Sequence, residues 1–374
     1  MNKIDKLLEE LCPEGVRFVK IGDICDCYAG ATPNTRQPDY WENGTIPWMS
    51  SGEVNKGEVW STEKKITQLG YDNSSTKMIP ANTVVIALAG QGKTRGTVAI
   101  VRIPLCTNQS LCSLVSKGEI LPDFLFHYLK GQYNTLRKIS SGDGTRGGLN
   151  LKMVSAFEVP IPPIPVQEEI VRILDKFASL AAELQAELQA RQKQYEYYRG
   201  KLLTFTKIGG GTQSVTWMKM SELFDIRNGY TPSKAKSEYW DNGSIPWFRM
   251  EDIRQNGRKL ADSIQHITLE AVKGGRLFPA GSFIIATTAT IGEHALLIAD
   301  SLANQQFTNL SVRKSLTVKV NMEFIYHYLF IVGKWCKQNT NAGGFASVDM
   351  NKFKSLEIPI PPLAEQERIA AILD

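Results

Sequence analysis

The sequence predicts an α+β protein of two similar β-rich, loop-rich domains joined by a long helix that forms a coiled coil. Three observations predict this fold class. A proline-rich motif and the segment around it occur twice, about 200 residues apart, which is the length of a domain and far exceeds a solenoid period of roughly 20 to 50 residues. Each copy holds short β-branched and apolar runs between turn signals. A heptad pattern of apolar residues separates the two copies.

The proline-rich motif closes each copy. Residues 158–175 have the sequence EVPIPPIPVQEEIVRILD, and residues 357–374 have the sequence EIPIPPLAEQERIAAILD. A second motif, Gly-x-Thr-Pro followed by Tyr-Trp-x-Asn-Gly-x-Ile-Pro-Trp, begins at Gly30 and again at Gly229. Its Asn-Gly pair suits the positive φ angles of a tight turn. We therefore expect domains at residues 1–157 and 208–356, a helical spacer at 158–207 and the start of a second spacer at 357–374.

The same elements are expected in the same order in both copies. A short strand begins each copy, and two β-rich runs follow the Asn-Gly turn. An Asn-Gln pair precedes the next strand, and a helix with a Phe-His-Tyr or Tyr-His-Tyr segment comes before the proline motif. These expected elements lie at residues 16–21, 79–90, 94–101, 108–109 and 121–130 in the first copy, and at 215–223, 278–289, 294–300, 304–305 and 321–330 in the second.

The spacer segment has apolar residues at alternating steps of four and three, interrupted only by Arg191. Pro165 suits the first turn of a helix, and the glycines at 209–211 would end it. Such a helix of about 40 residues would be about 60 Å long. The seam comprises Ile170, Leu174, Phe177, Ala181, Leu184, Leu188, Arg191, Tyr195, Tyr198, Leu202 and Phe205.

An apolar stripe on a long helix must be buried against a partner. The second spacer repeats the register with Ile369 and Leu373, but the sequence ends at Asp374. The apolar residues near the N-terminus, from Ile4 to Leu11, are enough to cover only part of the seam. We therefore expect either a second spacer that is truncated relative to its ancestor or a coil completed by another chain.

Composition indicates a globular protein outside the membrane. No apolar stretch approaches the roughly 20 residues that a membrane helix needs, and the charged N-terminal segment is not a secretory signal, so a cytoplasmic location is expected. A net charge of +5 permits an anionic partner. Among the six cysteines, Cys25, Cys27 and Cys106 align with apolar residues of the second copy and no pair has zinc-ligand spacing, which favours core packing over metal binding or disulfides.

Residues 87–94, ALAGQGKT, match a permissive phosphate-loop pattern. A phosphate loop requires a helix that begins at the Lys-Thr pair, whereas Arg95 and Gly96 lead directly into a predicted strand. The second copy has no lysine in this loop. A hairpin tip that presents its polar residues to DNA is the better interpretation, and a simply solvated tip is an equally open alternative. The predicted DNA-contacting residues of the first copy are Gln91, Lys93, Thr94, Arg95, Arg36 and Arg146.

In the second copy the candidate DNA contacts are cationic residues near the Thr-Pro turn and after the Ile-Pro-Trp segment. Different polar residues on similar scaffolds are what two different target sequences require. The recurring Tyr-Trp and Trp residues have rings of the kind that stack on bases, but their recurrence favours a structural role. The predicted DNA-contacting residues of the second copy are Lys234, Lys236, Arg249, Arg254, Arg258 and Lys259.

No catalytic constellation is recognisable: the sequence has no nucleophile elbow, no HExxH motif and no amino-methylation motif. His127 and His327 recur inside the predicted helices, which favours packing over metal binding. These features together indicate a binding subunit.

The two motifs and the spacer sequence KFASLAAELQAELQARQKQYEYYRGKLLTF resemble the specificity subunits of type I restriction-modification systems. The resemblance covers almost the whole chain. It implies a protein that recognises a bipartite double-stranded DNA target and docks two methyltransferase subunits, and through them the restriction subunits. It also implies that S-adenosylmethionine and ATP with Mg²⁺ are bound by these partners, and that this chain is not an enzyme and binds no cofactor or metal.

The spacer seam residues Ile170, Leu174, Phe177, Leu184, Leu188, Tyr195, Tyr198 and Leu202 are then the expected partner and coiled-coil contacts. The alternative from another class is a structural adaptor whose coiled coil holds an enzyme and whose repeated domains bind protein. Steep loss of DNA binding with rising salt distinguishes a DNA-binding subunit from an adaptor. An ATP-dependent enzyme built on the 91–94 loop is a third alternative, and it requires ATP binding that Lys93→Ala abolishes.

The spacer contains the tetrapeptide Ala-Glu-Leu-Gln twice in succession, at residues 182–185 and 186–189. One tetrapeptide changes the helix by about 6 Å in length and about 40° in rotation, against about 3.4 Å per base pair. Adding or removing one copy should therefore change the gap between the two half-sites by about one or two base pairs. Methylation mapping of cells carrying the variant should show both half-site sequences unchanged, and an altered half-site would contradict this prediction.

Overall fold

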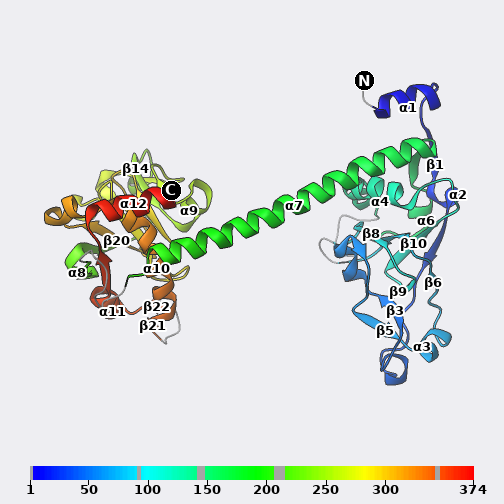
Figure 1. Ribbon diagram of the computed structural model, residues 1–374, viewed down its shortest axis with the longest axis horizontal. Coiled ribbons are helices and arrows are strands. Elements are labelled where there is room, and N and C mark those ends of the chain that lie inside the picture. Colours follow the sequence, from blue (N-terminus) through cyan, green and yellow to red (C-terminus); the bar gives the residue numbers. More distant parts are fainter. Residues whose placement is uncertain (1–2, 91–93, 141–147, 206–214, 342–345) are drawn as a thin grey trace. The chain divides into compact units, whose positions relative to one another are not determined.

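The computed structural model describes residues 3–90, 94–140, 148–205, 215–341 and 346–374. The chain divides into two compact units, Met1–Ala186 and Glu187–Asp374. Each unit carries one β-rich domain, and a single long helix separates the two domains (Figure 1). The predicted α+β class is therefore confirmed.

The first domain is built around a mixed five-stranded sheet with a smaller four-stranded sheet beside it. Its elements are α1 (Lys3–Leu11), β1 (Arg17–Lys20), α2 (Ile21–Ile24), β2 (Cys25–Ala29), η1 (Pro38–Tyr40), β3 (Ile46–Met49), η2 (Ser51–Lys56), β4 (Glu58–Val59), β5 (Lys64–Ile66), α3 (Gln68–Asp72), β6 (Met78–Ile79), β7 (Thr83–Ala87), β8 (Val98–Val101), β9 (Leu105–Thr107), β10 (Leu111–Ser116), α4 (Pro122–Gly131), α5 (Tyr133–Ile139), α6 (Leu151–Ser155) and β11 (Glu158–Ile161).

The second domain repeats this order after the long helix α7 (Ile164–Leu202). Its elements are β12 (Thr216–Lys219), α8 (Met220–Leu223), β13 (Phe224–Asn228), η3 (Ser237–Tyr239), β14 (Ile245–Phe248), α9 (Met250–Asn256), β15 (Lys259–Leu260), β16 (His266–Ile267), η4 (Leu269–Ala271), η5 (Lys273–Gly275), β17 (Phe283–Ala286), β18 (His294–Leu297), β19 (Leu302–Ala303), β20 (Phe307–Val312), η6 (Lys314–Lys319), α10 (Met322–Gln338), β21 (Thr340–Asn341), β22 (Ser347–Val348), α11 (Met350–Ser355), β23 (Glu357–Ile360) and α12 (Leu363–Leu373).

The two five-stranded sheets have the same topology. The strand order is β2-β10-β7-β8-β4 in the first domain and β13-β20-β17-β18-β15 in the second. In both sheets the last strand pairs in parallel with its neighbour, and the other pairs are antiparallel. The internal sequence repeat is therefore a repeat of the fold.

The central strand of each sheet is buried on both faces. In β7, Val84 and Ile86 belong to one apolar cluster, and Val85 and Ala87 belong to another on the opposite face. This placement explains why the sequence is a continuous apolar run and does not alternate, as a strand with one solvated face would. In the second domain, residues 283–286 divide between two clusters in the same alternating way.

Four of the six cysteines, Cys25, Cys106, Cys112 and Cys336, are buried core residues. All six thiols are free. Cys25 and Cys106 are buried, and the equivalent Phe224 and Leu302 are buried too. Burial raises the pKa of Cys25 to about 12, so this thiol stays protonated at neutral pH.

The recurring Gly-x-Thr-Pro and Ile-Pro-Trp residues hold each domain together. A Cβ at Gly30 would lie 1.9 Å from the carbonyl oxygen of Thr107, so no larger residue fits there. The indole Nε1 of Trp48 donates to the carbonyl of Ala31 at 2.9 Å, and Trp41 packs edge-on against Trp48 with ring centroids 5.0 Å apart. The second domain repeats these contacts at Gly229, Trp240 and Trp247. The structural interpretation of the tryptophans is therefore supported over base stacking.

Helix α7 extends over 39 residues, and Pro165 lies in its first turn as expected. Most of its predicted seam is exposed: Leu174, Phe177, Leu184 and Leu188 are each between 39% and 66% exposed. The seam is covered only near its ends, where Ile170 packs on the first domain and Leu202 on the second. Although α7 is long, no helix among the described residues is both long and apolar enough to cross a membrane.

The proline motif ends each domain in the same way. β1 pairs with β11, and β12 pairs with β23, so the segment entering each domain lies beside the segment leaving it. The strand prolines Pro160 and Pro359 are tolerated because these two-stranded sheets have free edges. Helices α7 and α12 begin immediately after β11 and β23, respectively.

The glutamine of each proline motif is fully buried. The side chain of Gln167 accepts from the Leu121 backbone N–H at 2.7 Å and donates to the carbonyls of Pro162 at 2.8 Å and Glu119 at 3.2 Å. Gln366 bonds in the same way to the backbone of Asn321, Pro361 and Lys319. Each glutamine therefore joins the spacer helix to the loop that precedes the main helix of its domain.

The histidines His127 and His327 make a second recurring link. His127 Nε2 lies 2.8 Å from a carboxylate oxygen of Asp175 in α7, and His327 Nε2 lies 3.1 Å from Asp374 after α12. Burial is the main cause that lowers the pKa of His327 below its usual value, with the Asp374 carboxylate opposing it. The sequence interpretation of these histidines as packed helix residues is consistent with these contacts.

Replacing Gln167 with Met should destabilise the first domain alone, by about 2 to 4 kcal/mol, because the substitution leaves a buried N–H and two buried carbonyls without partners. Hydrogen exchange should show lost protection at the Leu121 amide and faster exchange through the first domain in denaturant. Gln189→Met, an exposed substitution on the same helix, is the control and should change neither. Equal destabilisation of both domains, or unchanged protection at Leu121, would refute the role of this side chain.

Candidate nucleic-acid interface

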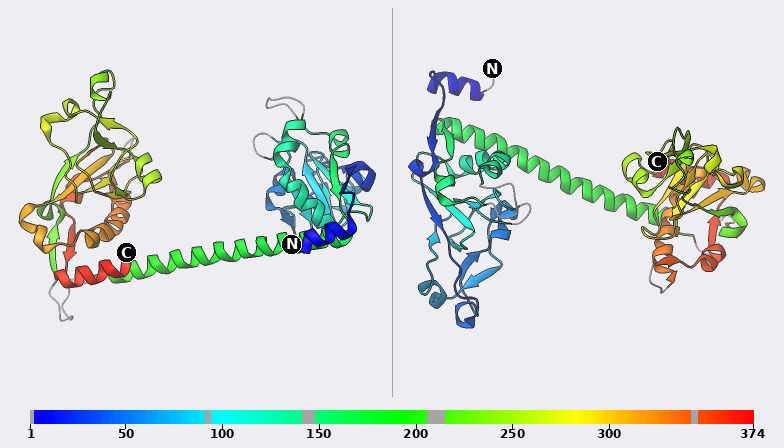
Figure 2. Two further views of the ribbon diagram at one scale, coloured as in Figure 1. Left: turned by 90° about the horizontal axis from the view of Figure 1, so that it is seen from above. Right: turned by 180° about the vertical axis from the view of Figure 1, so that it is seen from behind.

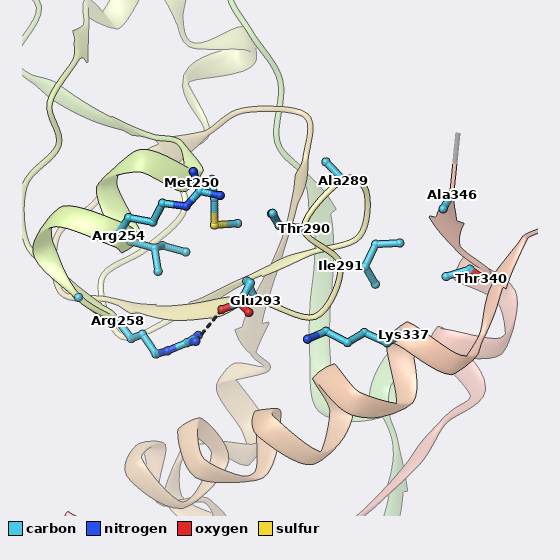
Figure 3. A pocket seen from close by; sticks show the side chains of 12 residues that line it. Met250, Arg254, Arg258, Ala289, Thr290, Ile291, Glu293, Lys337, Thr340 and Ala346 are labelled. Carbon is cyan, nitrogen blue, oxygen red and sulfur yellow. Dashed lines mark hydrogen bonds and ion pairs between the residues drawn. The ribbon is translucent and has the colours of Figure 1, made fainter. Parts of the chain in front are cut away.

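The second domain contains a cleft of about 770 Å³ between α9, the β17–β18 hairpin and the end of α10 (Figure 3). Its walls combine apolar side chains with cationic side chains from different elements, and Arg258 and Glu293 meet across it. A smaller cleft of about 290 Å³ adjoins it and shares Met250, Arg254, Ala289 and Thr290. The larger cleft is lined by Met250, Ile253, Arg254, Gly257, Arg258, Ala289, Thr290, Ile291, Glu293, Lys337, Thr340 and Ala346.

A close backbone contact fixes the hairpin on α10. Gly292 has a φ of +87°, and a Cβ there would lie 2.3 Å from the carbonyl oxygen of Gly333. A Cβ at Gly333 would meet the carbonyl oxygen of Gly292 at 2.4 Å. Because neither position accepts a side chain, the two glycines determine how near the hairpin lies to α10.

A buried carboxylate positions α9 on the other wall. Asp252 is fully buried, and its carboxylate accepts from the backbone N–H of Arg249 at 2.7 Å and of Ile264 at 2.7 Å. These bonds satisfy the first turn of α9 and fix the loop that follows it. In the first domain Glu53 does the same for η2, with bonds to the N–H groups of Ser50 and Glu63.

The cationic side chains of the cleft are of two kinds. Arg258 forms an ion pair with Glu293 at 2.6 Å and donates to the carbonyl of His294 at 3.1 Å, and Arg249 pairs with Glu251 at 3.0 Å. Arg254 and Lys337 are exposed and have no ion pair with any described residue. The paired arginines hold the walls of the cleft in place, whereas the positive charges of Arg254 and Lys337 are available to attract an anion.

Below the cleft, aromatic packing connects its wall to the spacer helix. The guanidinium of Arg199, in α7, lies 4.0 Å from the ring centroid of Phe330 and is almost buried, and that of Arg258 lies 5.1 Å from the same ring. His294 packs edge-on against Phe330 with centroids 4.4 Å apart. Burial, with the nearby Arg258 charge, lowers the pKa of His294 to about 3, so this residue is neutral at pH 7.

Comparison with known proteins identifies the family. Residues 13–191 and 214–374 each match the family described as Type I restriction modification DNA specificity domain. The chain belongs to this family of specificity subunits. The EcoR124I/EcoR124II specificity subunit of Escherichia coli is 31% identical over 100% of this chain and 89% of its own length. The EcoprrI specificity subunit of Escherichia coli is 51% identical over 43% of this chain, which spans only 42% of that relative.

Solved structures show the same fold. The HsdS subunit from Thermoanaerobacter tengcongensis matches with a TM-score of 0.57 and 19% identity, over 97% of this chain and 89% of that one. A chain from a study of complex assembly and conformational transition in the type I R-M system matches with a TM-score of 0.69, also at 19% identity, over 97% and 90%. The protein is thus a type I restriction-modification specificity subunit with target-recognition domains, and it is not a catalytic subunit.

The structure of the specificity subunit brings three of the predicted contacts of the second domain together. Arg249, Arg254 and Arg258 all line the two adjoining clefts. The other three lie outside them. Lys234 is exposed in the Thr-Pro turn, Lys236 lies 3.2 Å from the hydroxyl of Tyr239, and Lys259 pairs with Glu323 at 2.9 Å.

In the first domain the predicted contacts are placed less completely. Gln91, Lys93 and Arg146 lie outside the described residues. Thr94 and Arg95 lie in the turn before β8, so a strand and not a helix follows the Lys-Thr pair, as predicted. Arg36 is exposed in the Thr-Pro turn.

Sequence reasoning missed cationic residues that the fold brings to these clefts. Lys337 reaches the large cleft from the end of α10, which extends well beyond the predicted 321–330 segment. In the first domain Lys64 and Lys65 line a cleft of about 410 Å³ with Thr35 and Trp41. The internal repeat gives no signal for Lys337, because the equivalent helix of the first domain, α4, ends at Gly131 and does not have this extension.

Replacing Arg254 with Gln should weaken DNA binding by the assembled complex about uniformly across sequences and reduce the slope of log K against log salt by about one, if this guanidinium contacts a phosphate. Binding measured at several salt concentrations gives both quantities. Lys314→Gln removes the same charge from an exposed helix that lines neither cleft and is the matched control. An unchanged salt slope in the Arg254 variant would exclude a phosphate contact.

Proposed function

We propose that this specificity subunit recognises a bipartite double-stranded DNA target, with one half-site for each domain. One observation carries the proposal: the two domains share their scaffold contacts, yet the exposed polar residues on that scaffold differ. The Trp pairs, the buried glutamines and the glycine at the Thr-Pro turn recur. The exposed Arg254 follows the buried Asp252 by two residues, whereas the exposed Asn55 takes that place after the buried Glu53 in the first domain. Conserved scaffolds with different polar surfaces suit two different half-sites.

We also propose that two methyltransferase subunits dock on the spacer helices. The exposed seam of α7 supports this proposal, since a helix carrying Leu174, Phe177, Leu184 and Leu188 at 39% to 66% exposure needs a partner. A continuous apolar stripe of this kind suits helix packing by knobs into holes. The seam is flanked by charged side chains such as Glu183 and Glu187, which keep the helix solvated on its other faces.

The division of labour follows from this assembly. S-adenosylmethionine belongs on the methyltransferase subunits, and ATP with Mg²⁺ belongs on restriction subunits that join through them. The specificity subunit contributes DNA recognition and the geometry between half-sites. A complex that acts on cellular DNA is placed in the cytoplasm.

Exchanging residues 16–157 for the equivalent domain of a relative should change one half-site of the methylated sequence and leave the other half-site and the gap unchanged. The exchange keeps the spacer helix and its buried Gln167, so the assembly is preserved. Methylation mapping in cells that carry the chimaera and the methyltransferase subunits measures the outcome.

The reciprocal exchange of residues 216–356 is the matched control and should change only the other half-site. If either chimaera changed both half-sites, the one-domain, one-half-site assignment would be wrong. A complex whose DNA binding did not weaken with salt would favour the structural adaptor over a DNA-binding subunit.

A further inference from the structure

A polar pocket in the second domain lies apart from the cationic cleft. It has a volume of about 400 Å³ and is lined mainly by amide and hydroxyl side chains, together with Val348, Asp349 and Met350. The hairpin after β17 separates it from the cleft, since Thr287 and Thr288 line the pocket and Ala289 and Thr290 line the cleft. Its main polar side chains are Asn228, Thr287, Thr288, Gln305, Asn341 and Asn351.

A chain of buried hydroxyls fixes the orientation of Asn228. Thr308 is fully buried and donates from Oγ1 to Asn228 Oδ1 at 3.0 Å. The hydroxyl of Thr287, also buried, lies 3.1 Å from Thr308 Oγ1. Because the Thr308 proton goes to Asn228, Thr287 donates to Thr308. This arrangement uses every hydroxyl proton, whereas the flipped amide would leave Thr287 without an acceptor.

The exposed Asn228 therefore presents its Nδ2 donor to the pocket. Gln305 is oriented in the same sense, because its Oε1 accepts from the hydroxyl of Thr231 and its Nε2 is left as a donor. Both amides are thus held in place before any ligand arrives. Preoriented donors are suited to hydrogen-bond acceptors at fixed positions.

The first domain has a counterpart of the Gln305 contact but no counterpart of the hydroxyl chain that orients Asn228. Gln109 accepts from Thr32 at 2.5 Å, as Gln305 does from Thr231. At the strand pair where Asn228 lies opposite Thr308, the first domain has Ala29 opposite Cys112. The residue after the central strand is Leu88 in place of Thr287. The hydroxyl chain and its amide are therefore specific to the second domain.

We propose that Asn228 determines specificity in the second domain by donating from Nδ2 to an acceptor on a base edge, such as N7 or O6 of a purine or O4 of thymine. The inference rests on the proposed one-domain, one-half-site function and adds the residue and the chemistry. A residue that is common to both domains cannot distinguish two half-sites. Asn228 differs between them, is exposed, and is held by a network that has no other evident purpose.

The test is methylation mapping in cells that carry the full chain with its methyltransferase subunits. Asn228→Ala restores the residue of the first domain and should make one base position of one half-site degenerate, with discrimination falling about 10- to 100-fold. Asn228→Asp replaces the donor with an acceptor and should shift preference at that position towards bases with an exocyclic amino group. The other half-site and the gap should not change in either variant.

Thr308→Val removes the hydroxyl proton that orients the Asn228 amide. It should reduce base discrimination at the same position although Asn228 itself is unchanged. Asn73→Ala changes an exposed amide of the first domain that donates to the Leu69 carbonyl, and this control should leave the motif unchanged. Unchanged stringency in both Asn228 variants, equal loosening of both half-sites, or loss of all methylation in every variant of the pocket would overturn the inference. A wild-type complex without a bipartite methylation motif would instead refute the proposed function itself.

Discussion

The fold of each half depends on one buried glutamine. Gln167 and Gln366 each bind three backbone groups that belong to the proline exit and to the loop before the main helix. A buried amide that bonds to one backbone donor and two backbone acceptors fixes the direction of the spacer helix, whereas an apolar residue of equal size would let the helix rotate. The spacer helix therefore leaves its domain at a set angle. This explains why the motif is repeated almost letter for letter, while most of the domain surface differs.

The end of the spacer is also joined to the candidate DNA-binding cleft within the second domain. Arg199 of α7 and Arg258 of the cleft wall both contact Phe330 of α10, and Tyr195 of α7 donates to the carbonyl of Leu373 in α12, which lies beside the last turns of α7 (Figure 2). α10 in turn carries Gly333, against which the hairpin packs. The wall that presents Arg254 is thereby part of the same packed unit as the helix end.

The sequence predicts the scaffold of each domain, but it does not predict which distant residues the fold brings together at a cleft. The buried strand β7, the Asn-Gly turns and the 39-residue helix follow from apolar runs, turn chemistry and heptad steps, which are local signals. The cleft depends on which exposed residues the fold brings together. Arg254 was identified by its charge, but Lys337 and Asn228 come from distant segments and carry no local motif. Arg258 and Lys259, also predicted from their charge, form ion pairs with Glu293 and Glu323, which lie far along the chain.

The β7–β8 and β17–β18 hairpins explain how the two domains diverge on one scaffold. Both leave the central strand at an equivalent alanine, Ala87 and Ala286, whose carbonyl accepts from the glycine at the return, Gly96 and Gly292. The closing bond is the same, so residues between these points are free to vary in number and polarity without disturbing the sheet. The first domain has the longer and more cationic segment, with Lys93 and Arg95, whereas the second has a shorter one flanked by Thr287. A loop closed by a constant backbone contact costs little to lengthen, so this hairpin can change in length and polarity while the buried glutamine and the sheet stay the same.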